Sequence, residues 1–325
     1  MPTMQNAHID RALTNTSVAY LQDASAFIAD KVFPIVPVKR QSDVFYIYNK
    51  GDFMRDEAQV RGAASESAGG DYGVAASDPY YCRKHAFHKD VTPEERANYD
   101  EPLDADMDAT DFVTQKMLIR REMEWASKFF ATGVWGTEIE GKEASPSVGQ
   151  TLQWDQATSD PIKDITGAGV AMASETGYKP NTLVLSPYAF NALKNHEDIL
   201  DRIKYTQRGI VTTDLLATLF DVDKVLVAWS VVNSAAKGAT DSVDFIMGKH
   251  ALLCYAAPRP ALKKPSAGYI FAWTGLEGSG AYGNRIVRLP MDVLGLGTER
   301  IEGEIAFDVK KVCADLGVFF KNIVA

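Results

Sequence analysis

The feature that most constrains the fold is a long polar stretch between two strand-like segments. Val44 to Tyr48 (VFYIY) is rich in β-branched and aromatic residues, and the turn signal Asn49-Lys50-Gly51-Asp52 closes it. The polar, glycine-rich residues Met54 to Asp78 follow, and strand character resumes from Pro79 to Val91. Loops this long are usually functional or mobile, and this one has too few apolar residues to form its own core. We therefore expect a long excursion from the body of the protein.

The first forty residues predict an arm. Ala12 to Val32 shows moderate helical spacing of its apolar residues. In the following segment, Phe33 to Val38, Pro34 and Pro37 forbid a helix and remove backbone donors. An extended apolar arm has little local structure in which to bury itself, so we expect it to pack on another surface.

The clearest predicted helix runs from Thr110 to Thr132. Asp108, Thr110 and Asp111 offer caps and first-turn acids, and Gly133 stands where a glycine often ends a helix. At 1.5 Å per residue such a helix is roughly 35 Å long. The predicted apolar stripe is Phe112, Ile119, Met123, Ala126 and Phe130, widened by Leu118, Trp125 and Phe129.

Beyond this helix the pattern predicts a polar connection, an α/β region and an antiparallel return. The connection covers residues 134–160. The α/β region has predicted helices at 160–176, 187–204 and 213–220, strands at 181–185, 224–230 and 244–257, and a flexible loop at 233–242. The returning strands are predicted at 268–274, 285–292 and 299–314. The fold class is therefore α+β.

Composition excludes several kinds of protein. The chain has 325 residues, of which 46% are apolar and 24% charged, with a net charge of −9 and a pI near 5.2. No basic run exceeds a pair of residues, which argues against a dedicated nucleic-acid-binding protein but allows a wall that faces DNA. Because the sequence has no signal-like start and no apolar run of about 20 residues, we expect folding in a cytosol and no membrane partner.

Possible metal sites are weak in this sequence. Cys82, Cys254 and Cys313 have no short spacing, so buried free thiols are favoured over disulfides or a metal site. Cys82, His85 and His88 recur every three residues and would point to opposite faces of a strand, which disfavours zinc. The acids of DADMDATD from Asp104 suit a helix start better than a calcium loop. We assign no metal and no cofactor.

The catalytic motifs are equally weak. The GxGxxG match at 278–283 precedes a strand-like segment, whereas dinucleotide binding needs a helix there. The GxxxxGK match in Gly136 to Glu143 (GTEIEGKE) follows a helix and carries three glutamates, which would repel phosphate. His196 and His250 have no visible nucleophile partner, and we assign no catalytic residue.

Several long stretches resemble the tailed-bacteriophage major capsid (head) protein family, with the Hong Kong phage capsid fold, and are most similar to its E-type branch. The resemblance covers nearly the whole chain, in the order of arm, strand, long loop, strand, long helix, α/β region and antiparallel return. The stretches that carry it are FIADKVFPIVPV from Phe27, YNKGDFMRDEAQVR from Tyr48, PLDADMDATDFVTQKMLIRREMEWASKFFATGVWG from Pro102, PNTLVLSPYAFNALKNHEDILDRIKYTQRGIVTTDLLATLFDVDKVLVA from Pro180, GKHALLCYAAPRP from Gly248 and RIEGEIAFDVKKVCADLGVFF from Arg300.

The resemblance implies a division of the chain. It places the N-arm at 1–40, the E-loop hairpin and flanking strands at 41–91, the P-domain with a spine helix (104–133) at 92–157, the A-domain at 158–267 and returning P-domain strands with a C-terminal segment at 268–325. The E-loop, about residues 50–80, would reach over a neighbouring copy. Any scaffold would be a separate protein. Some relatives cross-link a loop lysine covalently, and Lys50 lies in that region, but we do not assign the reaction.

The implied function is that of a major capsid protein, not an enzyme. Copies would self-assemble into hexamers and pentamers of an icosahedral phage head enclosing double-stranded DNA, made in the bacterial cytoplasm and located in the virion. Scaffolding, portal and possibly decoration proteins would be partners, and DNA would be contacted non-specifically. The expected assembly residues are Phe33, Pro34, Pro37, Lys50, Asp52, Arg55, Asp56, Glu57 and Arg61. Alternatives are a cellular nanocompartment shell of the same fold, a soluble α/β enzyme with a site in 158–260, and a tail or baseplate protein.

Overall fold

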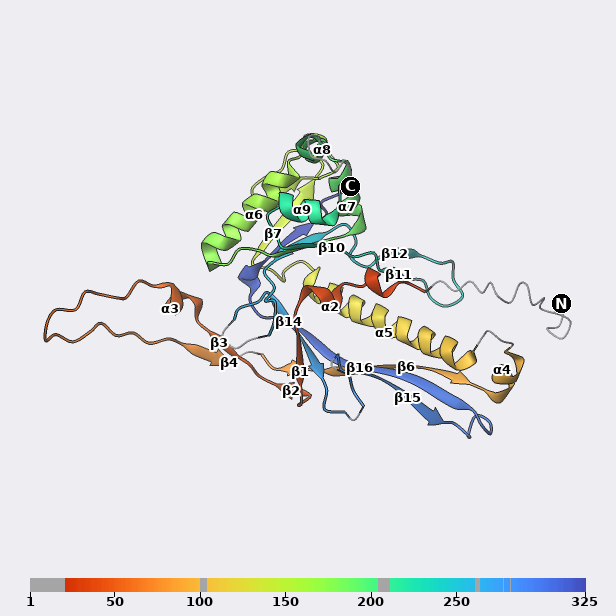
Figure 1. Cartoon of the computed structure of the whole chain (residues 1–325). Coiled ribbons are helices and arrows are strands. Elements are labelled where there is room, and N and C mark those ends of the chain that lie inside the picture. Colours follow the sequence, from red (N-terminus) through yellow and green to blue (C-terminus); the bar gives the residue numbers. More distant parts are fainter. Residues whose placement is uncertain are drawn as a thin grey trace.

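The body of the protein consists of two sheets, from which a long loop projects on one side (Figure 1). The computed structural model describes residues 21–76, 78–99, 104–203, 211–260, 264–276, 278–280 and 282–325. A six-stranded sheet carries four helices: α6 (Pro161–Thr176), α7 (Pro187–Asn195), α8 (Glu197–Ile203) and α9 (Thr213–Leu219). A five-stranded sheet carries the long helix α5 (Ala105–Phe129). The predicted α+β class is confirmed.

The five-stranded sheet is built around its longest strand, β16. Strand β16 pairs with three others in antiparallel fashion, and the edge strand β1 joins in parallel to β14. The predicted antiparallel return is therefore confirmed. The strands are β1 (Ile35–Val38), β14 (Gly268–Trp273), β16 (Glu299–Lys311), β15 (Asn284–Pro290) and β6 (Arg83–Val91).

Helix α5 begins and ends earlier than the sequence suggests. The carboxylate of Asp104, not a later acid, caps it by accepting the N–H groups of Asp106 and Met107. The helix ends at Phe129, so Gly133, with φ of +83°, belongs to the following turn and does not terminate the helix directly. At 25 residues its length is about 37 Å.

The predicted apolar stripe of α5 is wrong at two positions, because Phe112 is 42% exposed and Met123 38% exposed. The buried face uses small residues toward the N-terminus and aromatic residues toward the C-terminus. Gly303 of β16 lets the helix lie close to the sheet, since a Cβ there would be 2.4 Å from Cγ1 of Val113. The buried residues are Ala105, Ala109, Val113, Glu122, Trp125, Ala126 and Phe129.

The six-stranded sheet is buried on both faces. Leu183 and Leu253 face the helices, whereas Val184 and Leu252 face the cluster that contains Trp125 of α5. The predicted polar connection at 134–160 is partly wrong, because it contains two strands that extend this sheet. The strand order is β10 (Lys224–Val227), β9 (Thr182–Leu185), β13 (Ala251–Cys254), β17 (Gly317–Lys321), β7 (Thr137–Lys142) and β8 (Gln150–Leu152).

The arm packs on its own protein over much of its length. Ile28 and Phe33 are almost fully buried in the core between the two sheets, and Phe27 is also fully buried. The expectation that the arm covers another surface is therefore wrong from Phe27 to Val38, where apolar side chains and the parallel pairing of β1 with β14 hold it in place. Residues 1–20 lie outside the described part of the chain. The arm contains η2 (Ala24–Ala26) and α2 (Ala29–Val32).

Shorter elements complete the fold. The long loop connects the two strands of one two-stranded ribbon, and another two-stranded ribbon lies beside α7. The remaining elements are β2 (Ser42–Asp43), β3 (Tyr46–Tyr48), α3 (Lys50–Met54), β4 (Val74–Ala76), β5 (Tyr80–Tyr81), α4 (Pro93–Asn98), β11 (Val231–Asn233), β12 (Val243–Phe245) and η3 (Ala314–Leu316). Among the described helices, none has the length and apolar character to span a membrane.

Candidate assembly surfaces

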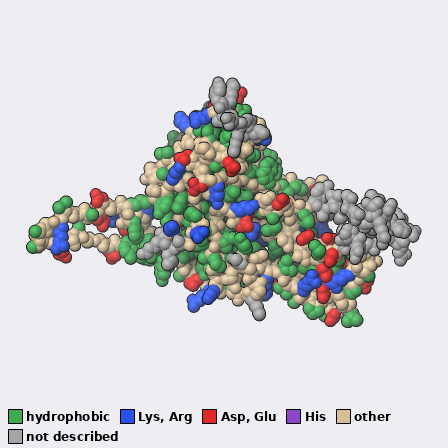
Figure 2. Space-filling model, viewed as in Figure 1, with side chains coloured by type: hydrophobic (Ala, Val, Ile, Leu, Met, Phe, Trp, Pro, Cys, Tyr) green, Lys and Arg blue, Asp and Glu red, His purple; other side chains and the backbone are tan. Residues whose placement is uncertain are grey.

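The protruding loop, residues 49–73 between β3 and β4, is the most exposed part of the described chain. It extends far from both sheets, toward the side opposite α4 (Figure 1). Every described side chain from Phe53 to Ala76 is exposed. Figure 2 shows that hydrophobic and charged side chains both occur along it. A segment with this little contact to its own body is available to bind another surface.

The base of the protruding loop is braced. Asn49 caps α3, accepting the N–H of Gly51, and the turn signal predicted at 49–52 is thus the start of a one-turn helix. The N–H of Gly73 donates to Asp52 across the loop at 2.9 Å. Lys50 forms an ion pair with Asp315 at 2.5 Å. These contacts fix the direction in which the loop leaves the body.

Apolar residues of the protruding loop were missed by sequence reasoning, which named its charged residues. Phe53 contacts the rings of Tyr48 and Tyr72, with centroid distances of 6.0 and 5.3 Å, yet remains largely exposed. Val60, near the middle of the 49–73 segment, is completely exposed. Isolated large apolar residues in a polar stretch are the signal that could have identified them, because such residues are favoured at interfaces.

The predicted assembly residues fall into three groups. Phe33 is 1% exposed in its own core, which leaves it little surface for contact with another copy, and its assembly role stays a prediction. Pro34 and Pro37 line an open apolar hollow of about 300 Å³ together with Tyr282. Lys50 and Asp52 belong to the braced base, and the exposed charged residues of the outer loop are Arg55, Asp56, Glu57 and Arg61.

A second exposed apolar surface lies at the turn between β15 and β16. Val293 is 95% exposed, Leu294 57% and Leu296 89%. The turn is ordered by its own backbone, since the N–H of Met291 donates to Thr298 at 2.8 Å. We call these three aliphatic residues the aliphatic tip.

Arg96 of α4 holds the aliphatic tip against α5. Its guanidinium bonds Asp106 at the start of α5, Glu299 at the start of β16 and the carbonyl of Gly297. The tip is thus presented on a rigid support. A pre-organised apolar surface loses little conformational entropy on binding.

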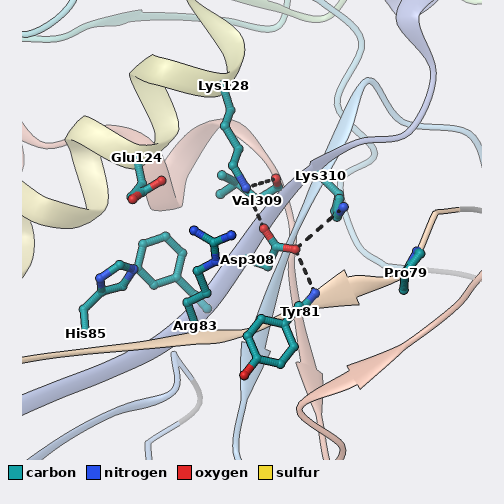
Figure 3. Close-up of a pocket in the computed structure, with 10 residues that line it drawn as sticks. Pro79, Tyr81, Arg83, His85, Glu124, Lys128, Asp308, Val309 and Lys310 are labelled. Atoms are coloured by element: carbon teal, nitrogen blue, oxygen red, sulfur yellow. Dashed lines mark hydrogen bonds and ion pairs between the residues drawn. The ribbon is translucent and has the colours of Figure 1, made fainter.

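A cationic hollow of about 190 Å³ lies between α5, β6 and β16 (Figure 3). Asp308 at its wall accepts the backbone N–H of Tyr81 at 2.9 Å and the ammonium of Lys128 at 2.7 Å. Lys310 lies 3.9 Å from the same carboxylate. The guanidinium of Arg83 points into the space between Glu124, Lys128 and Asp308 (Figure 3).

One histidine has a partner that sequence reasoning missed. Nε2 of His196 lies 3.0 Å from Oγ of Ser159, and both residues are buried. The N–H of Asp198 donates to Nδ1 at 3.3 Å, which assigns the proton to Nε2. Ser159 in turn donates to the carbonyl of Gln156. A general base would need a free lone pair on Nε2, but Nε2 carries the proton. We therefore assign this hydrogen-bond chain a structural role.

The cysteines and acidic residues form no metal cluster within the described ranges. Cys82 and Cys254 are buried free thiols, and burial raises the pKa of each thiol to about 12. His85 and His88 are three residues apart in β6, so their side chains face opposite sides of the sheet. Asp104 and Asp106 are occupied by helix capping and by Arg96, respectively.

The two sheets, the long helix and the protruding loop together define the fold of phage capsid subunits. A crystal structure of a phage-related protein from Bordetella bronchiseptica RB50 matches with a TM-score of 0.70, 23% identity and 93% coverage of each chain. The capsid of Cyanophage P-SCSP1u matches with a TM-score of 0.61 and 10% identity, over 99% of this chain and 92% of that chain. The holo-SrpI encapsulin complex from Synechococcus elongatus PCC 7942 matches with a TM-score of 0.55 and 12% identity, over 96% and 93%.

Curated sequences point to one group within that fold. The chain is 26% identical over 323 residues to the major capsid protein of Pseudomonas phage JBD67, covering 98% of this chain and 97% of the relative. It is 25% identical over 249 residues to the major capsid protein of Burkholderia phage BcepMu, covering 76% of each. No protein-family model matches the sequence. The resemblance to phage major capsid proteins is confirmed, and the E-type branch stays a prediction.

Proposed function

We propose that the chain is the major capsid protein of a tailed-phage head, where its copies assemble into a closed icosahedral shell. Relatives named as phage major capsid proteins match it over up to 98% of its length. The protruding loop is the observation that carries the proposal, because every side chain of residues 53–73 is exposed and the loop extends far from both sheets (Figure 1).

The shape of the subunit fits a lattice of different contacting surfaces. The protruding loop and the aliphatic tip lie at opposite ends of the molecule (Figure 1). The loop of one copy can therefore contact a second copy, whose own loop contacts a third. Such head-to-tail contacts close into rings when the rotation is suitable. Rings of six and of five copies are the capsomers of an icosahedral shell in this proposal.

The proposed domain division follows the capsid fold. We place the N-arm at 1–40, the E-loop with flanking strands at 41–91, the P-domain at 92–157, the A-domain at 158–267 and the returning strands at 268–325. Sheet membership refines this division, because β7, β8 and β17 pair within the six-stranded sheet of the proposed A-domain.

The shell would enclose double-stranded DNA and assemble with a separate scaffolding protein and a portal protein. The net charge of −9 suits a wall that surrounds phosphate without binding it tightly. Lys50 is paired with Asp315, and no cross-linking reaction is assigned to it. In this proposal the protein acts as a structural component of the virion, as the names of its relatives indicate.

A cellular nanocompartment shell is the second candidate function. The likeness to the encapsulin of Synechococcus elongatus, with a TM-score of 0.55, supports it. The curated relatives favour the phage reading, since both come from phages and match at 25–26% identity.

Electron microscopy of the expressed chain, alone and with its neighbouring genes, tests the proposal. We expect closed shells, with DNA inside when packaging proteins are present. Monomers alone under every assembly condition would contradict the proposal, and shells filled with an enzyme would favour the nanocompartment.

A further inference from the structure

The cationic hollow carries positive charge that the carboxylates of the described residues do not fully neutralise. Its two acids are already used, because Glu124 pairs with Arg120 of α5, and Asp308 accepts hydrogen bonds from Tyr81 and Lys128 and forms an ion pair with Lys310 at 3.9 Å. No carboxylate in the described ranges pairs with Arg83. Its lining residues include three cations, Arg83, Lys128 and Lys310, against two acids, Glu124 and Asp308, so the hollow carries more positive than negative charge in a chain of net charge −9.

The environment of His85 supports this charge assignment. His85 lines the hollow, and burial followed by the guanidinium of Arg120 lowers its pKa. Burial is the larger cause and disfavours any charge, whereas the smaller effect of Arg120 reflects positive charge beside the hollow. The ligand that fits best is a carboxylate, which Arg83 can bind with two parallel N–H groups.

The protruding loop supplies a carboxylate without a partner. Asp56 is exposed and forms no hydrogen bond or ion pair within the described ranges, and its neighbour Glu57 has only a 3.8 Å contact with Arg55. Asp56 lies just beyond α3, in the part of the protruding loop that extends from the body. Because the loop projects away from α5, β6 and β16 (Figure 1), whose residues line the hollow, Asp56 reaches such a site only on another copy.

We propose that the cationic hollow of each subunit binds the Asp56 carboxylate of a second copy of this chain, with Arg83 as its main ligand. This inference rests on the proposed shell function and identifies one contact within it. The charges are complementary and the loop enters from outside, so the contact favours correct neighbours and sets the register between subunits.

Charge reversal tests the contact. Arg83→Glu and Asp56→Arg should each lower particle yield about tenfold, because each places like charges at every copy of a repeated interface. The double variant Arg83→Glu/Asp56→Arg should recover yield to within about threefold of wild type, since the pair is restored with its charges exchanged. Mixing the two single variants should also restore particles, which an intramolecular contact could not do.

A matched control separates this pairing from net charge. Lys237 lies on the exposed loop between β11 and β12, and Lys237→Glu/Asp56→Arg has the same net charge as the rescuing double variant. It should assemble no better than Asp56→Arg alone. Circular dichroism of each unassembled subunit verifies folding, and Arg83→Gln and Asp56→Asn give milder changes if a reversal prevents folding.

The outcomes distinguish the two proposals. If the wild-type chain forms no shells, the proposed function fails. If it forms shells but the single reversals assemble normally, or if the double variant recovers no better than the Lys237 control, the Asp56 contact is overturned. Loss of assembly in Arg83→Glu alone, with Asp56→Arg unaffected, would assign the hollow to a different acidic partner and likewise overturn the proposal.

Discussion

The carboxylate of Glu122 on α5 accepts the backbone N–H of Ala29 in the arm, with 2.9 Å between Oε2 and the amide nitrogen. The N–H of Ile28 donates to the same carboxylate at 3.2 Å, and the hydroxyl of Ser230 lies 3.4 Å from Oε1. Glu122 is completely buried. One side chain therefore joins the arm, the long helix and the segment between β10 and β11.

Glu122→Ala should lower the free energy of unfolding by about 2 kcal/mol, because it leaves two buried N–H groups without an acceptor. Urea denaturation of the unassembled subunit measures the effect. Glu124→Ala, which removes a partly exposed ion pair with Arg120 and leaves no buried N–H group without an acceptor, should cost less than about 1 kcal/mol. Equal losses in the two variants would contradict this account of Glu122.

The stability that Glu122 contributes should depend on pH. Burial raises the pKa of this carboxyl above its ordinary value of 4.5, so the folded subunit binds a proton that the unfolded chain has released. The stabilisation is complete below pH 4.5 and is lost as the pH rises through the raised pKa. The unfolding free energy of wild type minus that of Glu122→Gln should therefore fall as pH increases above 4.5, and a rise would contradict the prediction.

Close contact between α5 and β16 depends on Gly303. Gly303→Ala should destabilise the subunit by about 1–3 kcal/mol, because the new methyl group would overlap Cγ1 of Val113. Thermal or urea unfolding measures the loss. Val113→Ala should be destabilising alone but should recover stability in the Gly303→Ala background, and simple additivity of the two changes would count against the contact.

Assembly should protect the protruding loop from proteolysis. Arg55 and Arg61 are exposed on extended backbone, so trypsin should cleave the unassembled subunit at both sites. In intact particles the same sites should resist cleavage, because a neighbouring subunit covers them. Dissociated particles should become sensitive again, whereas equal cleavage rates in both states would show that the loop has no intersubunit contact.

The aliphatic tip should matter for particles but not for the isolated fold. Replacing Val293, Leu294 and Leu296 by serine should change the unfolding free energy of the subunit by less than about 0.5 kcal/mol per site, since all three are exposed. Particles should form poorly or dissociate at lower temperature, as measured by light scattering. Normal particle stability would exclude the tip from the lattice contacts.

The local elements could largely be predicted from the sequence. The predicted strand at 181–185 and helix at 160–176 match β9 and α6 within a residue, because the strand is a short β-branched run and Asp160 and Pro161 start the helix. The loop at 54–78 was predicted from its polar composition, which cannot supply a core.

Contacts between distant residues could not be predicted in the same way. The spacing of apolar residues along α5 predicted that Phe112 is a core residue, but Phe112 is exposed. The helix instead packs a face of small residues against the sheet, and this close packing is possible because residue 303, far along the chain, is a glycine. The arm gave a similar error, since Phe33 is buried by β14 and α5, whose positions depend on the whole fold. Asp56 and Arg83 lie on separate segments, and only the structure shows that neither has an ion-pair partner among the described residues.

A cryo-electron microscopy reconstruction of assembled particles tests the central claim most directly. The account predicts that residues 49–73 of every subunit lie across a neighbouring copy, with the Asp56 region at the cationic hollow around Arg83. A closed shell in which each protruding loop contacts only solvent or its own subunit would contradict it.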